Sequence, residues 1–231
     1  MKKSERQEKM IEKSAVFYPI TAYTKNIAKA FTGMKKNYKK AKTDQARLRI
    51  CKKFVLKYLS LFEQYFKDIT SLIYSINQID ETLFPASPDG TEFNILYDEL
   101  SFLVWFESDQ DLQSIDRVMS QIFWGKKSFL EEVSRFPLKI SDPEEKNTFE
   151  NRWVIEISSS TFTLNKFFPQ WRKNINRLFQ MRTRYLKYPK KLINLDLERL
   201  VNLIKDADAL IFLSNSYIYE QLTARLVARL K

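Results

Sequence analysis

The chain has 231 residues, of which 44% are hydrophobic and 14% aromatic, and its formal net charge is +11. This apolar content is sufficient for a folded core and differs from the composition of disordered chains. Histidine is absent, and Cys51 is the single cysteine. The composition therefore excludes histidine-dependent nucleophiles and zinc sites, disulfides within the chain, and metal sites that need several cysteines.

Glycine is also rare, and the chain has 3: Gly33, Gly90 and Gly125. Sheet-rich folds need glycine at hairpin turns and bulges, and phosphate-binding loops need it so that backbone amides can approach the ligand. Three isolated glycines cannot form a P-loop, a dinucleotide fingerprint or a glycine-rich kinase loop. We predict an all-α protein, a single bundle of about six to seven helices with several long ones, in one domain over 1–231.

The sequence contains no apolar run near the roughly 20 residues that a membrane span needs. Its basic N-terminus lacks the apolar stretch of a signal peptide. With one cysteine and no disulfide, we expect a cytoplasmic protein. Cys51 falls on an apolar helical stripe, so we interpret it as a core thiol rather than a reactive one.

The first elements are set by one proline and one long apolar stripe. Pro19 disfavours helix at Tyr18, so residues 1–20 are predicted to be a separate basic N-terminal segment, in which residues 2–13 form either a frayed helix or a flexible tail. A short helix is predicted to follow over about 21–42. A long helix is predicted over about 44–79. Its apolar residues recur every three or four positions: Cys51, Val55, Tyr58, Phe62, Phe66, Ile69, Ile73 and Ile76.

Prolines divide the rest of the chain. Residues 84–91 are predicted to be a loop, with helices over about 92–107 and from 109 onwards. The second of these helices is capped by Ser108, bent or interrupted at Gly125, and ended before Pro137. The last three predicted helices follow. One begins at Asp142-Pro143 and runs through Trp153 and Ile157 toward Phe168, one is closed by Tyr188-Pro189, and the last is capped by Asn194 or Asp196.

Charge is segregated along the chain. Residues 1–57 hold 17 Lys and Arg against 4 Asp and Glu, residues 58–150 hold 7 against 18, and residues 151–231 hold 15 against 6. Two interpretations remain open. The acidic middle lies against the basic ends and neutralises them, or the basic ends converge on one face that binds a polyanion.

The segment 170–191 carries many cations and no acid. Cations that pair with phosphates, beside aromatic rings that stack on bases, are typical of single-stranded nucleic-acid binding. Basic amphipathic helices also dock on acidic partners or membrane surfaces, and a solvated outer helix with its aromatics in the core explains the pattern as well. The predicted nucleic-acid-binding residues here are Arg172, Lys173, Arg177, Arg182, Arg184, Tyr185, Lys187, Tyr188, Lys190 and Lys191.

A lysine-rich region at 25–57 adds Lys35, Lys36, Lys39 and Lys40 to the predicted binding residues. Arg182 differs from the other cations because it occupies a position on the apolar stripe of its helix. A buried arginine needs a carboxylate or carbonyl partner, so we favour a structural salt bridge over an arginine that points into a cleft.

The run from Arg182 to Tyr188 resembles the motif of HEPN-type ribonucleases, which are small helical bundles. In that family an Arg is followed after a few residues by a catalytic His near the start of a late helix. Here Tyr188 stands in place of the His, and Glu63 on an earlier long helix is similar to the family's acid. The resemblance implies a degenerate, non-cleaving component of a defence or toxin-antitoxin system, which binds RNA or an active HEPN partner.

Acidic pairs offer little support for metal-dependent catalysis. Asp206 and Asp208 lie two positions apart on a helix and should point to different faces. We therefore expect a non-enzymatic subunit of a larger complex, without cofactor or metal, that binds nucleic acid, with RNA favoured over DNA. The alternative is a protein–protein adaptor, in which exposed aromatic residues and charge bands form the interface.

Overall fold

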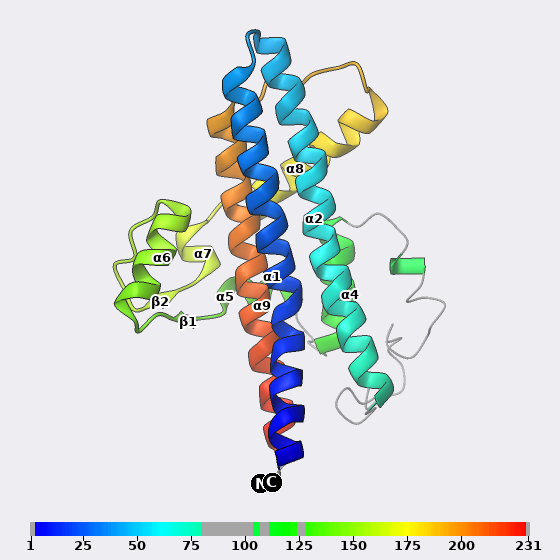
Figure 1. Cartoon of the computed structure of the whole chain (residues 1–231), viewed down its shortest axis with the longest axis vertical. Helices are drawn as coiled ribbons and strands as arrows, with labels where there is room; N and C mark the ends of the chain where they lie inside the picture. Colours follow the sequence, from blue (N-terminus) through cyan, green and yellow to red (C-terminus); the bar gives the residue numbers. More distant parts are fainter. Residues whose placement is uncertain (1–2, 80–103, 107–110, 124–127, 230–231) are drawn as a thin grey trace.

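The computed structural model describes residues 3–79, 104–106, 111–123 and 128–229 (Figure 1). Almost all of these residues are helical, which confirms the all-α fold class. The loop predicted at 84–91 lies outside the described residues. So does the helix predicted over about 92–107, except for 104–106, which are helical.

Three long helices run side by side along the molecule (Figure 1). The helix that begins after the turn at 41–43 is antiparallel to the first helix. Tyr58 of this second helix contacts the carbonyl oxygen of Ile204, and Tyr65 donates a hydrogen bond to Asn215, so the second helix and the last run in the same direction. The three are α1 (Lys3–Lys40), α2 (Asp44–Ile79) and α9 (Leu197–Arg229).

The bounds of α2 confirm the helix predicted over about 44–79. Its apolar stripe is buried between α1, α8 and α9, so the sequence periodicity identified the correct face. Asp196 caps α9, because its carboxylate accepts a hydrogen bond from the backbone N–H of Arg199 at 2.7 Å. The alternative cap at Asn194 is therefore not the one used.

The break predicted at Tyr18-Pro19 was wrong, whereas the alternative of a helix over residues 2–13 agrees with the structure. The first helix begins at Lys3, not near residue 21, and continues through Pro19. Proline has no N–H to donate to the carbonyl four residues earlier, but Pro19 itself is buried and the helix after it packs against its neighbours. Tyr23, Ile27 and Met34 are buried in the core, and this tertiary packing outweighs the local cost of the proline.

The helix predicted from residue 109 is two shorter helices, α4 (Leu112–Phe123) and α5 (Phe129–Arg135). Asp111 caps α4, because its carboxylate accepts a hydrogen bond from the backbone N–H of Ser114 at 2.7 Å, whereas Ser108 lies outside the described residues. The Asp116 carboxylate accepts from the Ser128 hydroxyl, at 2.7 Å to Oδ2, and from the backbone N–H of Leu130 at 2.9 Å. These bonds hold the start of α5 against α4.

The helix predicted from Asp142 begins at the expected position, but it ends earlier than predicted. It stops at Trp153, and Val154 adopts a left-handed conformation with φ of 53°. The Trp153 ring stacks on Phe162 at 5.4 Å, and Phe149 packs edge-on against Phe212 of α9 at 5.0 Å. This aromatic lobe consists of α6 (Pro143–Trp153), an antiparallel pair of strands, β1 (Leu138–Lys139) and β2 (Thr161–Phe162), and α7 (Leu164–Phe167).

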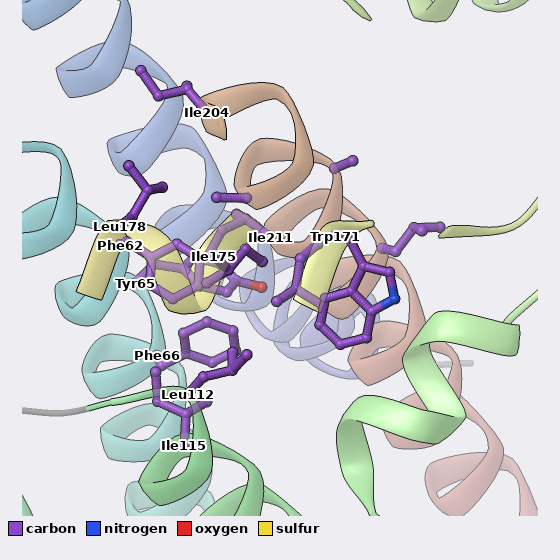
Figure 2. Close-up of a cluster of buried hydrophobic side chains, with 14 of the residues drawn as sticks. Phe62, Tyr65, Phe66, Leu112, Ile115, Trp171, Ile175, Leu178, Ile204 and Ile211 are labelled. Atoms are coloured by element: carbon purple, nitrogen blue, oxygen red, sulfur yellow. The ribbon is translucent and has the colours of Figure 1, made fainter. Parts of the chain in front are cut away.

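The helix α8 (Trp171–Lys187) crosses behind α2 and α9 and ends where Tyr188-Pro189 predicted. Its apolar face meets α2, α4 and α9 in the core (Figure 2). With α5, α7 and the others, eight helices have both ends among the described residues, and residues 104–106 are helical as well. The expectation of six to seven did not include the short helices that follow the breaks after Phe123 and Trp153.

The buried apolar side chains form one continuous cluster through these helices. The residues shown at its centre come from four of them: Phe62, Tyr65 and Phe66 from α2, Leu112 and Ile115 from α4, Trp171, Ile175 and Leu178 from α8, and Ile204 and Ile211 from α9 (Figure 2).

Candidate functional site

The two basic segments meet at one end of the bundle, where the α1–α2 turn lies near the C-terminal end of α8 (Figure 1). The ammonium group of Lys52 donates a hydrogen bond to the carbonyl oxygen of Pro189 at 2.6 Å and lies 5.2 Å from the ring centroid of Tyr185. We call this region, residues 35–53 with residues 184–191, the basic end. Its cations are Lys35, Lys36, Lys39, Lys40, Lys42, Arg47, Arg49, Lys52, Lys53, Arg184, Lys187, Lys190 and Lys191.

The basic end has few acids to offset its charge, and Asp196, which follows it in sequence, lies close enough to act on Cys51. Asp44 is the acid within its two ranges, and it pairs with Arg47 at 3.1 Å. The other cations of the basic end form no ion pair with any described residue. The acid-rich helices α5 and α6 lie in and beside the lobe on α9, away from the α1–α2 turn (Figure 1). The described acids of the middle segment therefore do not neutralise this end.

Lysines on the last turns of α1 form one side of the basic end. The four predicted binding lysines are exposed: Lys35, Lys36, Lys39 and Lys40. Lys35 lies 4.5 Å from the ring centroid of Phe31, and that ring packs against Phe54 of α2 at 5.8 Å. Cations near a helix C-terminus also complement the helix dipole, which gives Lys39 and Lys40 a local stabilising role in addition.

The outer face of α8 extends the positive surface from the basic end toward the middle of the molecule. Lys173, Arg177 and Arg184 lie at helical spacing on this face, so they project to the same side. They line a surface groove of about 560 Å³, whose floor includes Met181 and Ile193. An anionic chain in this groove would meet cations along its length.

Two of the predicted binding residues on α8 face elsewhere. Arg182 forms an ion pair with Glu63 of α2, and its side chain is 14% exposed. This result confirms the structural salt bridge predicted from its place on the apolar stripe. Arg172 lines a separate hollow of about 790 Å³ that it shares with Asp111 and Asp116 of α4, where the acids reduce the positive potential. Neither arginine belongs to the groove at Arg177 and Arg184.

The two candidate stacking tyrosines differ in exposure. Tyr185 is 2% exposed, because it lies on the same face of α8 as the buried Leu178 and packs toward α2, so its ring is not available to a ligand. Tyr188 follows the last residue of α8 and is 50% exposed. The prediction from sequence included both tyrosines as binding residues, because the sequence does not show which side of α8 is covered.

Cys51 lies under the basic end and is fully buried. Burial raises the pKa of its thiol, and the negative charge of Asp196 raises this pKa further. A raised thiol pKa lowers the fraction of reactive thiolate. The interpretation of Cys51 as a core thiol is confirmed.

A polar junction that the sequence did not predict joins the three long helices. The Tyr23 hydroxyl of α1 donates a hydrogen bond to Oδ1 of Asp208 on α9 at 2.7 Å, and the Tyr58 hydroxyl of α2 lies 3.3 Å from the same oxygen. Burial raises the pKa of Asp208, although these hydrogen bonds and the charge of Arg152 act in the opposite direction. Asp206 accepts instead from Asn174 of α8 at 2.8 Å, which confirms that the two acids point to different faces.

The described residues show no metal-ion site and no membrane-spanning helix. Within those ranges no three acidic or cysteine side chains gather closely enough to hold a metal ion. None of the described helices has the length and apolarity to cross a membrane. The aromatic residues are mostly in the core, and among the side chains whose exposure is described the exposed aromatics are Tyr18 and Tyr188.

A second hollow lies at the other end of the bundle, on the C-terminal half of α9. It measures about 730 Å³ and has a largely apolar lining that includes Phe136, Leu138, Tyr219 and Val227. The surplus of exposed aromatic residues expected for an adaptor is not found among the side chains whose exposure is described.

No family model, no curated protein and no solved structure matches this chain. The resemblance to HEPN-type ribonucleases therefore depends on Arg182, Tyr188 and Glu63 alone. Arg182 and Glu63 are in contact, which is the structural salt bridge expected of a buried arginine and does not test the resemblance. The argument for function rests on the geometry and charge of the basic end.

Proposed function

We propose that this chain is a non-enzymatic subunit that binds nucleic acid through the basic end and the adjoining groove on α8. The observation that supports the proposal most is the contact between Lys52 and Pro189, which brings together two cation-rich segments 137 positions apart. Each segment alone is explained by a solvated helix face. Their convergence at Lys52 places cations from both segments near one another, with Asp44 as the acid within the two ranges, and an excess of positive charge attracts a phosphate backbone.

The proposed contacts are mainly electrostatic. Lys36 and Lys39 on α1, with Arg177 and Arg184 on α8, are exposed and form no ion pair with any described residue. Their charges are therefore free to replace the counterions that condense on nucleic acid, and the release of those counterions drives binding at low salt. Affinity should fall steeply as salt concentration rises, because screening shortens to about 3 Å at 1 M salt.

The first experiment is size-exclusion chromatography with absorbance at about 260 and 280 nm and light scattering, run at low salt and at about 1 M salt. We expect nucleic acid to co-elute at low salt and to dissociate at high salt. A clean protein peak in both conditions, followed by no binding of added RNA or DNA, would contradict the proposal.

Charge reversal then locates the site. Arg177→Glu/Arg184→Glu tests the α8 groove, and Lys36→Glu/Lys39→Glu tests the end of α1. The matched control, Arg135→Glu/Lys139→Glu, makes the same change of net charge at exposed residues outside the basic end. We expect both test variants to lose RNA binding with unchanged oligomeric state, and the control to retain most of it. Equal losses in all three would show only an effect of net charge.

The second candidate function is a protein–protein adaptor, and the apolar hollow on α9 favours it. Val227 is 47% exposed at the edge of that hollow. Under this alternative, Val227→Glu would disrupt assembly with a protein partner. The charge-reversal variants of the basic end would then disturb assembly without any nucleic-acid phenotype.

A further inference from the structure

Tyr188 is an exposed aromatic ring within a cluster of cations. The residue is 50% exposed, and the ammonium groups of Lys187 and Lys191 lie 5.5 and 5.8 Å from its ring centroid. The other exposed aromatic residue whose side chain is described, Tyr18, lies on α1 about five turns before Lys35, roughly 25 Å along the helix. An aromatic surface therefore coincides with strong positive charge at Tyr188.

The turn that carries Tyr188 is held in place by the fold. The backbone N–H of Tyr188 donates to the carbonyl oxygen of Arg184 at 2.9 Å, and the N–H of Lys191 donates to the carbonyl oxygen of Tyr188 at 3.0 Å. Lys52 of α2 anchors the next carbonyl, that of Pro189, at 2.6 Å. The ring is thus presented from a turn bonded on both sides, so little conformational entropy is lost when a ligand packs on it.

We propose that Tyr188 stacks on an unpaired base, and that the preferred ligand of the basic end is a single-stranded nucleic acid. This inference rests on the proposed function and specifies its ligand. In a duplex the bases are paired and stacked on one another, so their faces are not accessible to a side chain along the helix. A single strand exposes base faces and phosphates together, and an aromatic ring flanked by cations contacts both.

The two lysines support this assignment. An ammonium group over an exposed ring contributes on the order of 0.5–1 kcal/mol. When a base occupies one ring face, Lys187 or Lys191 moves a short distance to a phosphate of the same strand and retains a favourable electrostatic contact. Tyr188 and its neighbouring lysines therefore provide one base contact with adjacent phosphate contacts.

The test compares three fluorescently labelled ligands of about 12 nucleotides: a single strand, a duplex, and a single strand of abasic sites that keeps its phosphates. Each is prepared as RNA and as DNA, and binding is followed by anisotropy. The variants are Tyr188→Ala, the conservative Tyr188→Trp, and Tyr18→Ala as an exposed tyrosine outside the basic end. Both tyrosines are exposed, so their substitution should leave the fold intact, and circular dichroism checks this.

We expect Tyr188→Ala to weaken single-strand binding by about 5-fold or more, since base stacking contributes on the order of 1–3 kcal/mol. Duplex and abasic binding should not change, Tyr188→Trp should preserve affinity, and Tyr18→Ala should have no effect. Equal weakening of all three ligands by Tyr188→Ala would show that Tyr188 only positions lysines and would overturn the stacking proposal. Tight wild-type binding that Tyr188→Ala does not alter would overturn it while leaving the proposed function intact. No wild-type binding to any ligand would contradict both.

Discussion

Arg182 of α8 forms an ion pair with Glu63 of α2, across 119 positions of sequence and with both side chains largely shielded from solvent. The pair lies beside the core where α8 crosses α2. It fixes the position of α8 relative to the long helices, and this position in turn sets the direction of the exposed cations on its outer face. The arginine that interrupts the apolar stripe therefore has a structural role in the proposed site.

Removal of one member of this pair should destabilise the fold. Arg182→Met leaves the Glu63 carboxylate largely buried without its cation, at a cost of about 3 kcal/mol. Urea unfolding measures this cost. The double variant Arg182→Met/Glu63→Leu should recover most of it, because no unpaired charge remains. Full stability of the single variant would show that the pair does not anchor α8.

The stability of the protein should depend on pH through Asp208. Burial raises the pKa of this carboxyl in the folded state, so the folded protein holds the proton more tightly than the unfolded chain. The resulting stability is fully present below the unfolded pKa near 4 and is lost as pH rises through the folded pKa. Tyr23, Tyr58 and Arg152 are the groups that act on it.

Asp208→Asn isolates this effect, because the amide oxygen still accepts a hydrogen bond from Tyr23. The variant should gain stability relative to the wild type as pH increases from about 4 to 7. Asp208→Leu should instead lose about 1–3 kcal/mol, because two buried hydroxyl groups lose an acceptor. Thermal unfolding across this pH range provides both comparisons. A constant difference between wild type and Asp208→Asn would exclude a raised pKa.

Val154 should be replaceable with a gain in stability. It is a β-branched residue with φ of 53°, and its side chain is 78% exposed, so it is strained and contributes little packing. Val154→Gly should stabilise the protein by about 1 kcal/mol, because glycine adopts this conformation without strain. Val154→Ala retains the strain and should gain less. Chemical denaturation of the wild type, Val154→Gly and Val154→Ala measures these differences in stability. A loss of stability on Val154→Gly would contradict the strain assigned to Val154.

Salt titration should count the phosphate contacts. If the ligand is a single strand, each cation that contacts a phosphate contributes about 0.7 to the slope of log K against log salt concentration. Lys39→Ala and Arg177→Ala should each reduce the slope by about this amount. Lys139→Ala, at an exposed lysine on β1, should leave it unchanged. A slope that none of these substitutions changes would place the phosphates elsewhere.

Local patterns in the sequence were sufficient to predict several elements. The bounds of α2 and the start of α6 at Asp142-Pro143 follow from periodicity and capping, which act within a few residues. For α9 the sequence offered Asn194 or Asp196 as the cap, and the structure selected Asp196. Where long-range packing competed with a local signal, the predictions failed. Pro19 lies inside α1, and α6 ends at Trp153 because its aromatic side chains pack against Phe162 and Phe212.

The sequence by itself determined the helical class, the excluded histidine and glycine-loop chemistries, and the two cation-rich segments. These properties depend on composition and on spacing along one helix. Only the tertiary structure decided that the segments meet through Lys52 and Pro189, that Arg182 is paired, and that Tyr188 rather than Tyr185 faces solvent. These outcomes depend on which side of α8 is covered by α2 and α9. That choice is made by core packing between helices that are separate in sequence, with Glu63 of α2 lying 119 positions from Arg182 of α8, and it lies beyond the range of any local pattern.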